Sequence, residues 1–452
     1  MSSTPPPKGK GCSLWLILGV PSGFLLILTL APALVYWIWS SGHAREVEKL
    51  TAEIAAKGEP LTSRALVDDF ELEADQENVA ALWIEAMTPL STREFGESCK
   101  ALPFVGYEWD GDPPRTDEPW EGLEEAEAFL KEHRLTFEKI DQAGARGGHA
   151  RFPMDFERGI HMEMPNVQYA RNIARMLQLQ FEVQSRRGDV EGAAKTLHAL
   201  FTLSRCCQAE PVIVAQLVAI AMDGCAKQAL ADKLGWLAFD GAFLLDVQRR
   251  LRAEDPANRM KKGLLGERAM IFVGMQDMSR IKDTLPARSA MSSDVHCYLR
   301  YMARLVDSIN LTFPDALRER DQIEKELKAE LSGVDAMVTK TLTMMLLPAT
   351  GAVFEAVAKD MTTTRAADAG IAAELHRRET GELPKTLEDL VPKYLPAVPT
   401  DPFDGSPMRY KSDETGFTIY SVGKNGADDG GSLDKAQSDV GLFFPTLTRK
   451  TE

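Results

Sequence analysis

The sequence lacks the short motifs that would name a reaction. It has no HExxH metal motif, no GxSxG nucleophile motif and no glycine-rich loop of the kind that holds phosphate groups. Its 7 histidines are scattered singly along the chain, so no two of them have the spacing of metal ligands. We therefore assign no catalytic residue and no organic cofactor, and an enzyme stays open only as an alternative whose site leaves no recognisable motif.

Cysteine is also scarce, and acidic residues outnumber basic ones. The 6 cysteines form no CxxC pair and no CxxCH haem motif. Without Cys12, which borders an apolar run, an odd number remains, which excludes a framework of paired disulfides but leaves one bridge between neighbouring helices open. The net charge of −15 argues against a nucleic-acid partner, which needs a basic face. Apolar content of 44% is that of a folded globular protein.

One uncharged run is long enough to cross a membrane. Residues 14–39 carry no charge, and at about 1.5 Å per residue they exceed a hydrocarbon core about 30 Å thick. Lys8 and Lys10 precede the run without a nearby acidic residue, which favours a cytoplasmic start. The pattern predicts a cytoplasmic tail at 1–11, a single transmembrane helix at 12–40 in the bacterial inner membrane, and an extracytoplasmic body.

A cleaved signal peptide is the alternative, with Ala31, Pro32 and Ala33 as the small-residue cleavage site. Apolar and aromatic residues continue beyond that site, which a mature N-terminus does not need, so we favour the retained anchor. The other apolar segments, 212–222 and 341–357, are interpreted as too short for a membrane span or broken by proline.

Helical patterns dominate residues 41–350, which we expect to form an irregular helical array. A long acidic loop is expected at 89–119, and Pro348 is interpreted as a hinge into the last domain. The adjacent Glu267 and Arg268 are interpreted as a buried ion pair. Helices are expected at 46–56, 78–87, 120–143, 166–187, from Asp189 to near 209, from Pro211 onward, and at 242–254, 258–278, 295–309, 314–331 and 335–347.

The last hundred residues combine a helix end with a β-hairpin. Gly381 follows a helix as its expected left-handed C-cap residue. Residues 386–390 are expected to form a short helix capped by its first threonine. Strands are expected near 408–410 and 417–422, where β-branched and aromatic residues gather. The segment therefore predicts a helix packed on an antiparallel hairpin.

The order GELP, DPFDGSPMRY and YSVGKNGADDGG resembles the C-terminal globular domain of the major pseudopilin of bacterial type II secretion. The resemblance covers residues 355–445 and implies a small α+β module at 351–452. The processing signature of that family is not met, because Leu28 stands where the family has glutamate. The expected fold is thus mostly α, with a single N-terminal transmembrane helix, the helical array and a pseudopilin-like α+β module.

An acidic, glycine-rich loop at 423–440 is the candidate metal site. In the pseudopilin family the matching loop holds a calcium ion, which takes six to eight oxygen ligands. Glycines in the loop allow several side chains to converge, although Asn-Gly and Asp-Gly are also ordinary turn dipeptides that need no metal. The residues expected to supply oxygens to Ca²⁺ are Asn425, Asp428, Asp429, Asp434 and Asp439.

The favoured function is that of a membrane-anchored envelope protein with a non-enzymatic binding or scaffold role. The resemblance implies a link to a secretion or pilus-like apparatus, and the expected partners are the inner membrane through residues 14–39 and an envelope protein. The alternative is an extracytoplasmic hydrolase with its site in the helical body. A deep cleft lined by ionisable groups favours the enzyme, and a broad groove or apolar patch favours the scaffold.

Overall fold

A computed structural model describes residues 42–72, 76–106, 108, 115–281, 285–333, 336–434 and 439–446. This part of the chain is mostly helical and ends in one small antiparallel sheet, as the sequence predicts. The predicted tail at 1–11 and anchor at 14–39 lie outside the described residues, so the single transmembrane helix stays a prediction.

The helices begin with one at 42–56, which confirms the expected first helix. The remaining helical elements are α2 (Ser63–Asp69), α3 (Ala80–Met87), η1 (Thr88–Ser91), α4 (Arg93–Ser98), α5 (Leu123–Glu132), α6 (Arg134–Arg146), η2 (Phe156–His161), α7 (Pro165–Arg187), α8 (Val190–Gln208), α9 (Ile213–Lys233), α10 (Gly241–Arg252), α11 (Pro256–Ile281), α12 (Leu285–Ser308), α13 (Phe313–Glu330), α14 (Ala336–Thr339), α15 (Thr341–Thr380) and η3 (Leu387–Leu390).

Local signals set the ends of several helices. Gly188 ends α7 with a left-handed φ of 71°, and the Asp189 side chain accepts a hydrogen bond from the Gly192 backbone to cap α8. Gly381 ends α15 in the same left-handed way, and Thr386 with Asp389 forms a capping box on η3. These ends lie where the sequence predicts them.

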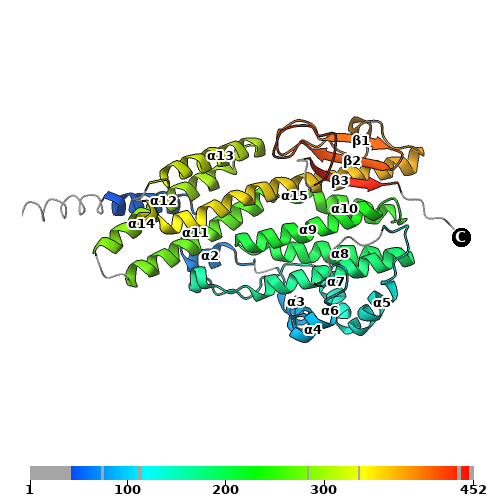
Figure 1. Cartoon of the computed structure of the whole chain (residues 1–452), viewed down its shortest axis with the longest axis horizontal. Helices are drawn as coiled ribbons and strands as arrows, with labels where there is room; N and C mark the ends of the chain where they lie inside the picture. The colour runs from blue at the N-terminus through cyan, green and yellow to red at the C-terminus, as the bar shows by residue number, and fades with distance from the viewer. Residues whose placement is uncertain are drawn as a thin grey trace, which may run out of the picture.

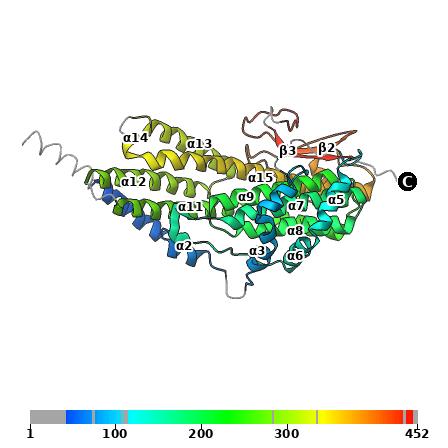
Figure 2. The same ribbon diagram turned by 60° about the horizontal axis from the view of Figure 1, so that its bottom comes forward.

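The helices run along the long axis of an elongated molecule, with the helix at 42–56 and the sheet at opposite ends (Figure 1). Helix α15 crosses most of that length, and the turned view shows the same course (Figure 2). It belongs to two hydrophobic cores, because Phe354 and Val357 lie in the core beside α12 and α13, whereas Ala366 and Ile371 lie in the core under the sheet. One 40-residue helix therefore joins both ends of the molecule.

The interpretation of Pro348 as a hinge is wrong, because α15 is continuous from residue 341 to residue 380. A proline inside a helix removes one hydrogen bond and costs about 3 kcal/mol. Leu347 and Phe354, 2% and 0% exposed, bury apolar surface on either side of it and offset that cost. The helix thus crosses the predicted domain boundary at 350/351.

Other expected elements differ in detail. The helix expected at 120–143 is two helices, α5 and α6, separated at His133. The loop expected at 89–119 contains η1 and α4, and α2 is an additional helix. Arg268 is fully buried but pairs with Glu59, Nη1 to Oε2 at 2.8 Å, so the expected pair with Glu267 is wrong.

The sheet has the order β1-β2-β3, formed by β1 (Arg409–Asp413), β2 (Gly416–Ser421) and β3 (Val440–Pro445). The antiparallel β1–β2 hairpin is the predicted one, whereas β3 is a third strand that the sequence analysis did not assign. Phe417 of β2 and Phe444 of β3 stack with ring centroids 4.7 Å apart and belong to the core with α15. The sheet is thereby fixed to the long helix.

Two described helices, α9 and α15, are long and apolar enough to cross a membrane. They overlap the segments 212–222 and 341–357 that the sequence analysis set aside as spans, which is compatible with a membrane protein. Helix α9 packs against α7, α8, α11 and α15, so its composition is also that of a core helix. The five described cysteines are all free thiols, so the structure has no bridge between their helices.

Candidate functional site

The acidic loop after β2 is held by its own hydrogen bonds. Asn425 donates from Nδ2 to Oδ2 of Asp429 at 3.0 Å, and Asn425 Oδ1 accepts the backbone N–H of Ala427 at 2.9 Å. Asp428 Oδ1 accepts from the Tyr420 hydroxyl at 3.1 Å and from the Gly430 backbone at 3.0 Å. Three of the five expected ligands, Asn425, Asp428 and Asp429, therefore share one compact turn.

Asp439 closes the same loop from its other end. Its Oδ2 accepts the backbone N–H groups of Asp429 at 3.1 Å and Gly431 at 2.9 Å. The side chain is only 5% exposed, and its Oδ1 has no hydrogen-bond partner among the described residues. A buried carboxylate oxygen without a partner costs free energy, so this atom is suited to a cation.

The loop does not gather all its carboxylates. Asp434 is exposed, and the structure brings no group of three acidic, histidine or cysteine side chains together for a metal across residues 42–446 where they are described. Asp439 therefore fits the expected calcium site by its unpartnered oxygen. Asn425, Asp428 and Asp429 fit it only by their proximity, because each already takes part in hydrogen bonds of the turn.

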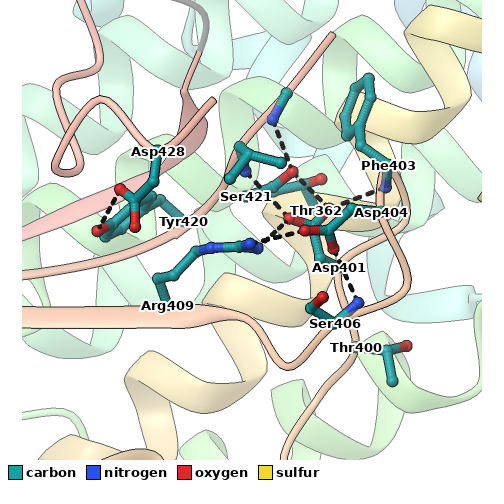
Figure 3. A network of polar contacts seen from close by, with 12 residues as sticks. Thr362, Thr400, Asp401, Phe403, Asp404, Ser406, Arg409, Tyr420, Ser421 and Asp428 are labelled. Atoms are coloured by element: carbon teal, nitrogen blue, oxygen red, sulfur yellow. Dashed lines mark hydrogen bonds and ion pairs between the residues drawn. The ribbon is translucent and has the colours of Figure 1, made fainter. Parts of the chain in front are cut away.

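The most recognisable motif, DPFDGSPMR, forms a polar clamp around Asp401 (Figure 3). Asp401 Oδ1 accepts from the Phe403 backbone at 2.8 Å and the Ser421 hydroxyl at 2.6 Å. Its Oδ2 accepts from Arg409 Nη1 at 2.6 Å and from the Val422 backbone at 3.0 Å. One fully buried carboxylate thus ties the turn at 401–406 to the strands β1 and β2.

Arg409 extends the clamp toward solvent. Its Nη2 donates to Asp404 Oδ2 at 2.6 Å, so one guanidinium bridges both aspartates of the motif. On β2, Ser421 belongs to the clamp and its neighbour Tyr420 bonds to the acidic loop (Figure 3). The residues that carry the pseudopilin resemblance therefore serve the folding of this module.

A second cluster of charges lies inside the helical body. Lys227 of α9 donates to Asp360 of α15, Nζ to Oδ1 at 2.5 Å, with both side chains 1% exposed. Arg259 contacts Asp360 at 2.5 Å, Asp223 at 3.4 Å and Glu254 at 3.4 Å. Burial raises the pKa of both Asp223 and Glu254. The cavity beside this cluster is only about 10 Å³, which is too small for a substrate.

Two features of the site region were missed by the sequence analysis. Strand β3 begins directly after Asp439, and the aromatic pair Phe443 and Phe444 was its signal. A larger cavity of about 480 Å³ lies between α7, α9 and β3. Its α9 residues recur at helical spacing, but only the folded chain shows that they face a cavity.

Comparison with known proteins gives no relative: no family model, no curated protein and no solved structure matches this chain. The pseudopilin resemblance thus stays a resemblance of motif order.

Proposed function

We propose that the chain is a membrane-anchored protein of the bacterial envelope that acts by binding another envelope protein. Residues 14–39 hold it in the inner membrane, 1–11 face the cytoplasm, and the helical body and terminal module lie outside. The uncharged run and the preceding lysines support this topology. Protease added to spheroplasts is expected to degrade the body, and a fully protected body contradicts the proposal.

The architecture supports a scaffold role. A single helix, α15, contributes to both hydrophobic cores, so the terminal module is held on the body by buried apolar contacts. The buried ion pair of Lys227 with Asp360 also joins segments far apart in the sequence. Such a body presents the terminal module at a fixed distance from its other end, and the resemblance implies a secretion or pilus-like apparatus as the setting.

We further propose that the acidic loop binds one Ca²⁺ and that this ion orders the terminal module. The observation that carries the proposal is the buried Oδ1 of Asp439, which has no hydrogen-bond partner among the described residues. Ca²⁺ takes oxygen ligands, and a carboxylate removed from water is stabilised by a cation beside it. Asn425, Asp428, Asp429 and Asp434 are the remaining candidate ligands.

Calcium binding is tested by thermal melting of the full chain in detergent, with millimolar CaCl₂ or with chelator. A ligand that binds only the folded form raises the melting temperature. Asp439→Asn is expected to abolish the calcium-dependent shift, whereas Asp68→Asn, at an exposed position of α2, keeps it. An unchanged melt of the natural protein in calcium means that the loop is an ordinary acidic turn.

Partner binding is tested separately, by pull-down of the full chain from detergent-solubilised membranes with and without calcium. We expect a specific envelope protein in the calcium sample and its loss with Asp439→Asn. A partner that the variant retains places the binding surface elsewhere on the body. The alternative, a hydrolase, has no support from the cluster around Arg259, because the adjoining cavity is about 10 Å³.

A further inference from the structure

A cavity beside the terminal module is lined by residues of α7, α9 and β3 together with Phe104, Arg115 and Thr116. Its volume is about 480 Å³, within the range of about 300–1,000 Å³ typical of small-molecule sites. Strand β3 contacts α9 directly. The cavity therefore forms only when the terminal sheet is docked on the helical body.

One face of α9 supplies the polar wall. Cys225, Gln228 and Asp232 follow one another at intervals of three and four residues, so they share one side of the helix. Gln228 donates from Nε2 to Asp232 Oδ1 at 2.7 Å, which fixes that carboxylate toward the cavity side of α9. This wall is thus built from a thiol, an amide and a carboxylate.

The opposite walls are aromatic. Phe181 of α7 is 3% exposed, and Phe443 of β3 lines the same space. Phe104, from the segment before α5, is the one non-glycine residue of the described chain with a positive φ, at 65°. Such a backbone costs about 1 kcal/mol or more for a bulky residue, and such strain clusters at ligand sites.

The charged side chains around the cavity differ in whether they have an oppositely charged partner. Lys233 pairs with Glu182 at 2.7 Å, and Glu182 also pairs with Arg186 at 2.6 Å. Asp232 accepts its hydrogen bond from a neutral amide and has no ion pair within the described residues. Burial raises the pKa of Asp232, against the hydrogen bond from Gln228 and the charge of Lys233.

The second cation of the wall is also engaged. Arg115 Nε donates to Asp117 Oδ1 at 3.2 Å, so Arg115 and Lys233 both have anionic partners, whereas Asp232 has no cationic partner within the described residues. An anionic ligand would have to displace one of these pairs. Burial disfavours the ionised carboxylate of Asp232, and a cationic group beside it stabilises that ionised form. Aromatic rings also attract cations.

We propose that this cavity binds a small aromatic amine, with the protonated nitrogen paired to Asp232 and the ring among Phe104, Phe181 and Phe443. The proposal is independent of the calcium loop, because the cavity uses none of the loop residues. The pocket thereby gives the envelope protein a soluble ligand in addition to its protein partner.

Isothermal titration of the full chain in nanodiscs tests the proposal, with empty nanodiscs as the blank. The probes are tryptamine, the neutral isostere tryptophol and the anion indole-3-acetate. Tryptamine is expected to bind at least about tenfold more tightly than tryptophol, because one ion pair in a partly buried site is worth about 1.4 kcal/mol or more. Indole-3-acetate is expected to bind most weakly.

Three variants locate the site. Asp232→Asn keeps the shape of the side chain and is expected to weaken tryptamine about tenfold while leaving tryptophol within about twofold. Ala229→Phe fills the cavity and is expected to remove binding of both probes. Asp141→Asn is the matched control, because burial also raises the pKa of Asp141 but this residue lines a different cavity beside α8.

Several results overturn the proposal. These are equal affinities of tryptamine and tryptophol for the natural protein, no binding of either probe, or an unchanged tryptamine affinity in Asp232→Asn. An equal loss in Asp141→Asn also overturns it, because the effect is then not specific to this cavity. If Asp232→Asn does not fold, the amine–alcohol comparison and the Ala229→Phe variant decide the question.

Discussion

Arg409 and Asp401 form an ion pair at 2.6 Å in which the aspartate side chain is 0% exposed and the arginine 23%. Asp401 is held by two side chains and two backbone N–H groups, so each of its oxygens is satisfied. A buried charge is tolerated only when it is paired and hydrogen-bonded in this way. The pair thus explains why the motif reads DPFDGSPMR.

The first prediction concerns that clamp. Asp401→Ala is expected to lower the free energy of unfolding by about 3–5 kcal/mol, because it leaves Arg409 Nη1, the Ser421 hydroxyl and two backbone donors without their acceptor. Asp404→Ala is the control, because Asp404 shares the same arginine but is 31% exposed, so a loss of about 1 kcal/mol or less is expected. Urea unfolding of the full chain in detergent measures both. Equal losses would contradict a special role for Asp401.

The second prediction concerns the buried pair between α9 and α15. Lys227→Met is expected to cost about 3–5 kcal/mol, because Asp360 then lies buried without its lysine. Lys359→Met, in the same helix as Asp360 but 51% exposed, is expected to change stability by about 1 kcal/mol or less. The same urea titration applies. A small effect of Lys227→Met would show that Arg259 alone neutralises Asp360.

The third prediction is a pH dependence carried by Glu210. Its side chain is 0% exposed and burial raises its pKa to about 7, although Arg151 lies 3.2 Å away and the Phe152 backbone donates at 2.7 Å. Between about pH 4.5 and 7 the folded chain therefore keeps a proton that the unfolded chain has released. Stability from this group is present below that window and falls as pH rises through it, by on the order of 3 kcal/mol.

Glu210→Gln removes that proton equilibrium, so its unfolding free energy is expected to fall less steeply between pH 4.5 and 7 than that of the natural protein. Glu94→Gln, at an exposed position of α4, is expected to keep the natural slope. Urea unfolding at several pH values measures the slopes, which are informative even if Glu210→Gln lowers stability overall by leaving Arg151 without its partner. Identical slopes in all three proteins would refute the assignment.

The sequence predicted features that are decided locally. The glycines after α7 and α15, the Asp189 cap and the β1–β2 hairpin depend on a few neighbouring residues, and all lie where expected. Pro348 shows the limit of local signals, because tertiary burial of Leu347 and Phe354 maintains a helix that proline disfavours. The partner of Arg268 was missed for the same reason, because Glu59 is distant in the sequence.

The candidate site also combines features that neighbouring residues predict with features that only the tertiary fold determines. Asn425, Asp428 and Asp429 are near one another in the chain, so their shared turn was predictable, and the calcium ion itself stays a prediction. The lack of a partner for Asp439 Oδ1 among the described residues is a property of the fold and could not be predicted from composition. Nor could the cavity beside Asp232, which requires α7, α9 and β3 to meet.

The last prediction tests how β3 is held on α15. Gly370 lies against the Phe444 ring so closely that a Cβ added to it would be 2.1 Å from the ring's Cζ atom. That ring is 2% exposed and stacked on Phe417, so it has little room to move. Gly370→Ala is therefore expected to destabilise the protein by about 1–3 kcal/mol through overpacking, despite the higher helix propensity of alanine.

Gly351→Ala is the matched control, because it makes the same substitution in the same helix. A Cβ at residue 351 meets its nearest neighbour, an atom of Arg320, at 3.7 Å, which is an ordinary contact. The higher helix propensity of alanine is then the remaining effect, so Gly351→Ala is expected to stabilise the protein by up to about 1 kcal/mol. Urea unfolding followed by helical circular dichroism measures both variants. Opposite signs support close packing of β3 on α15, whereas two stabilising substitutions would mean that Phe444 moves freely away from the helix.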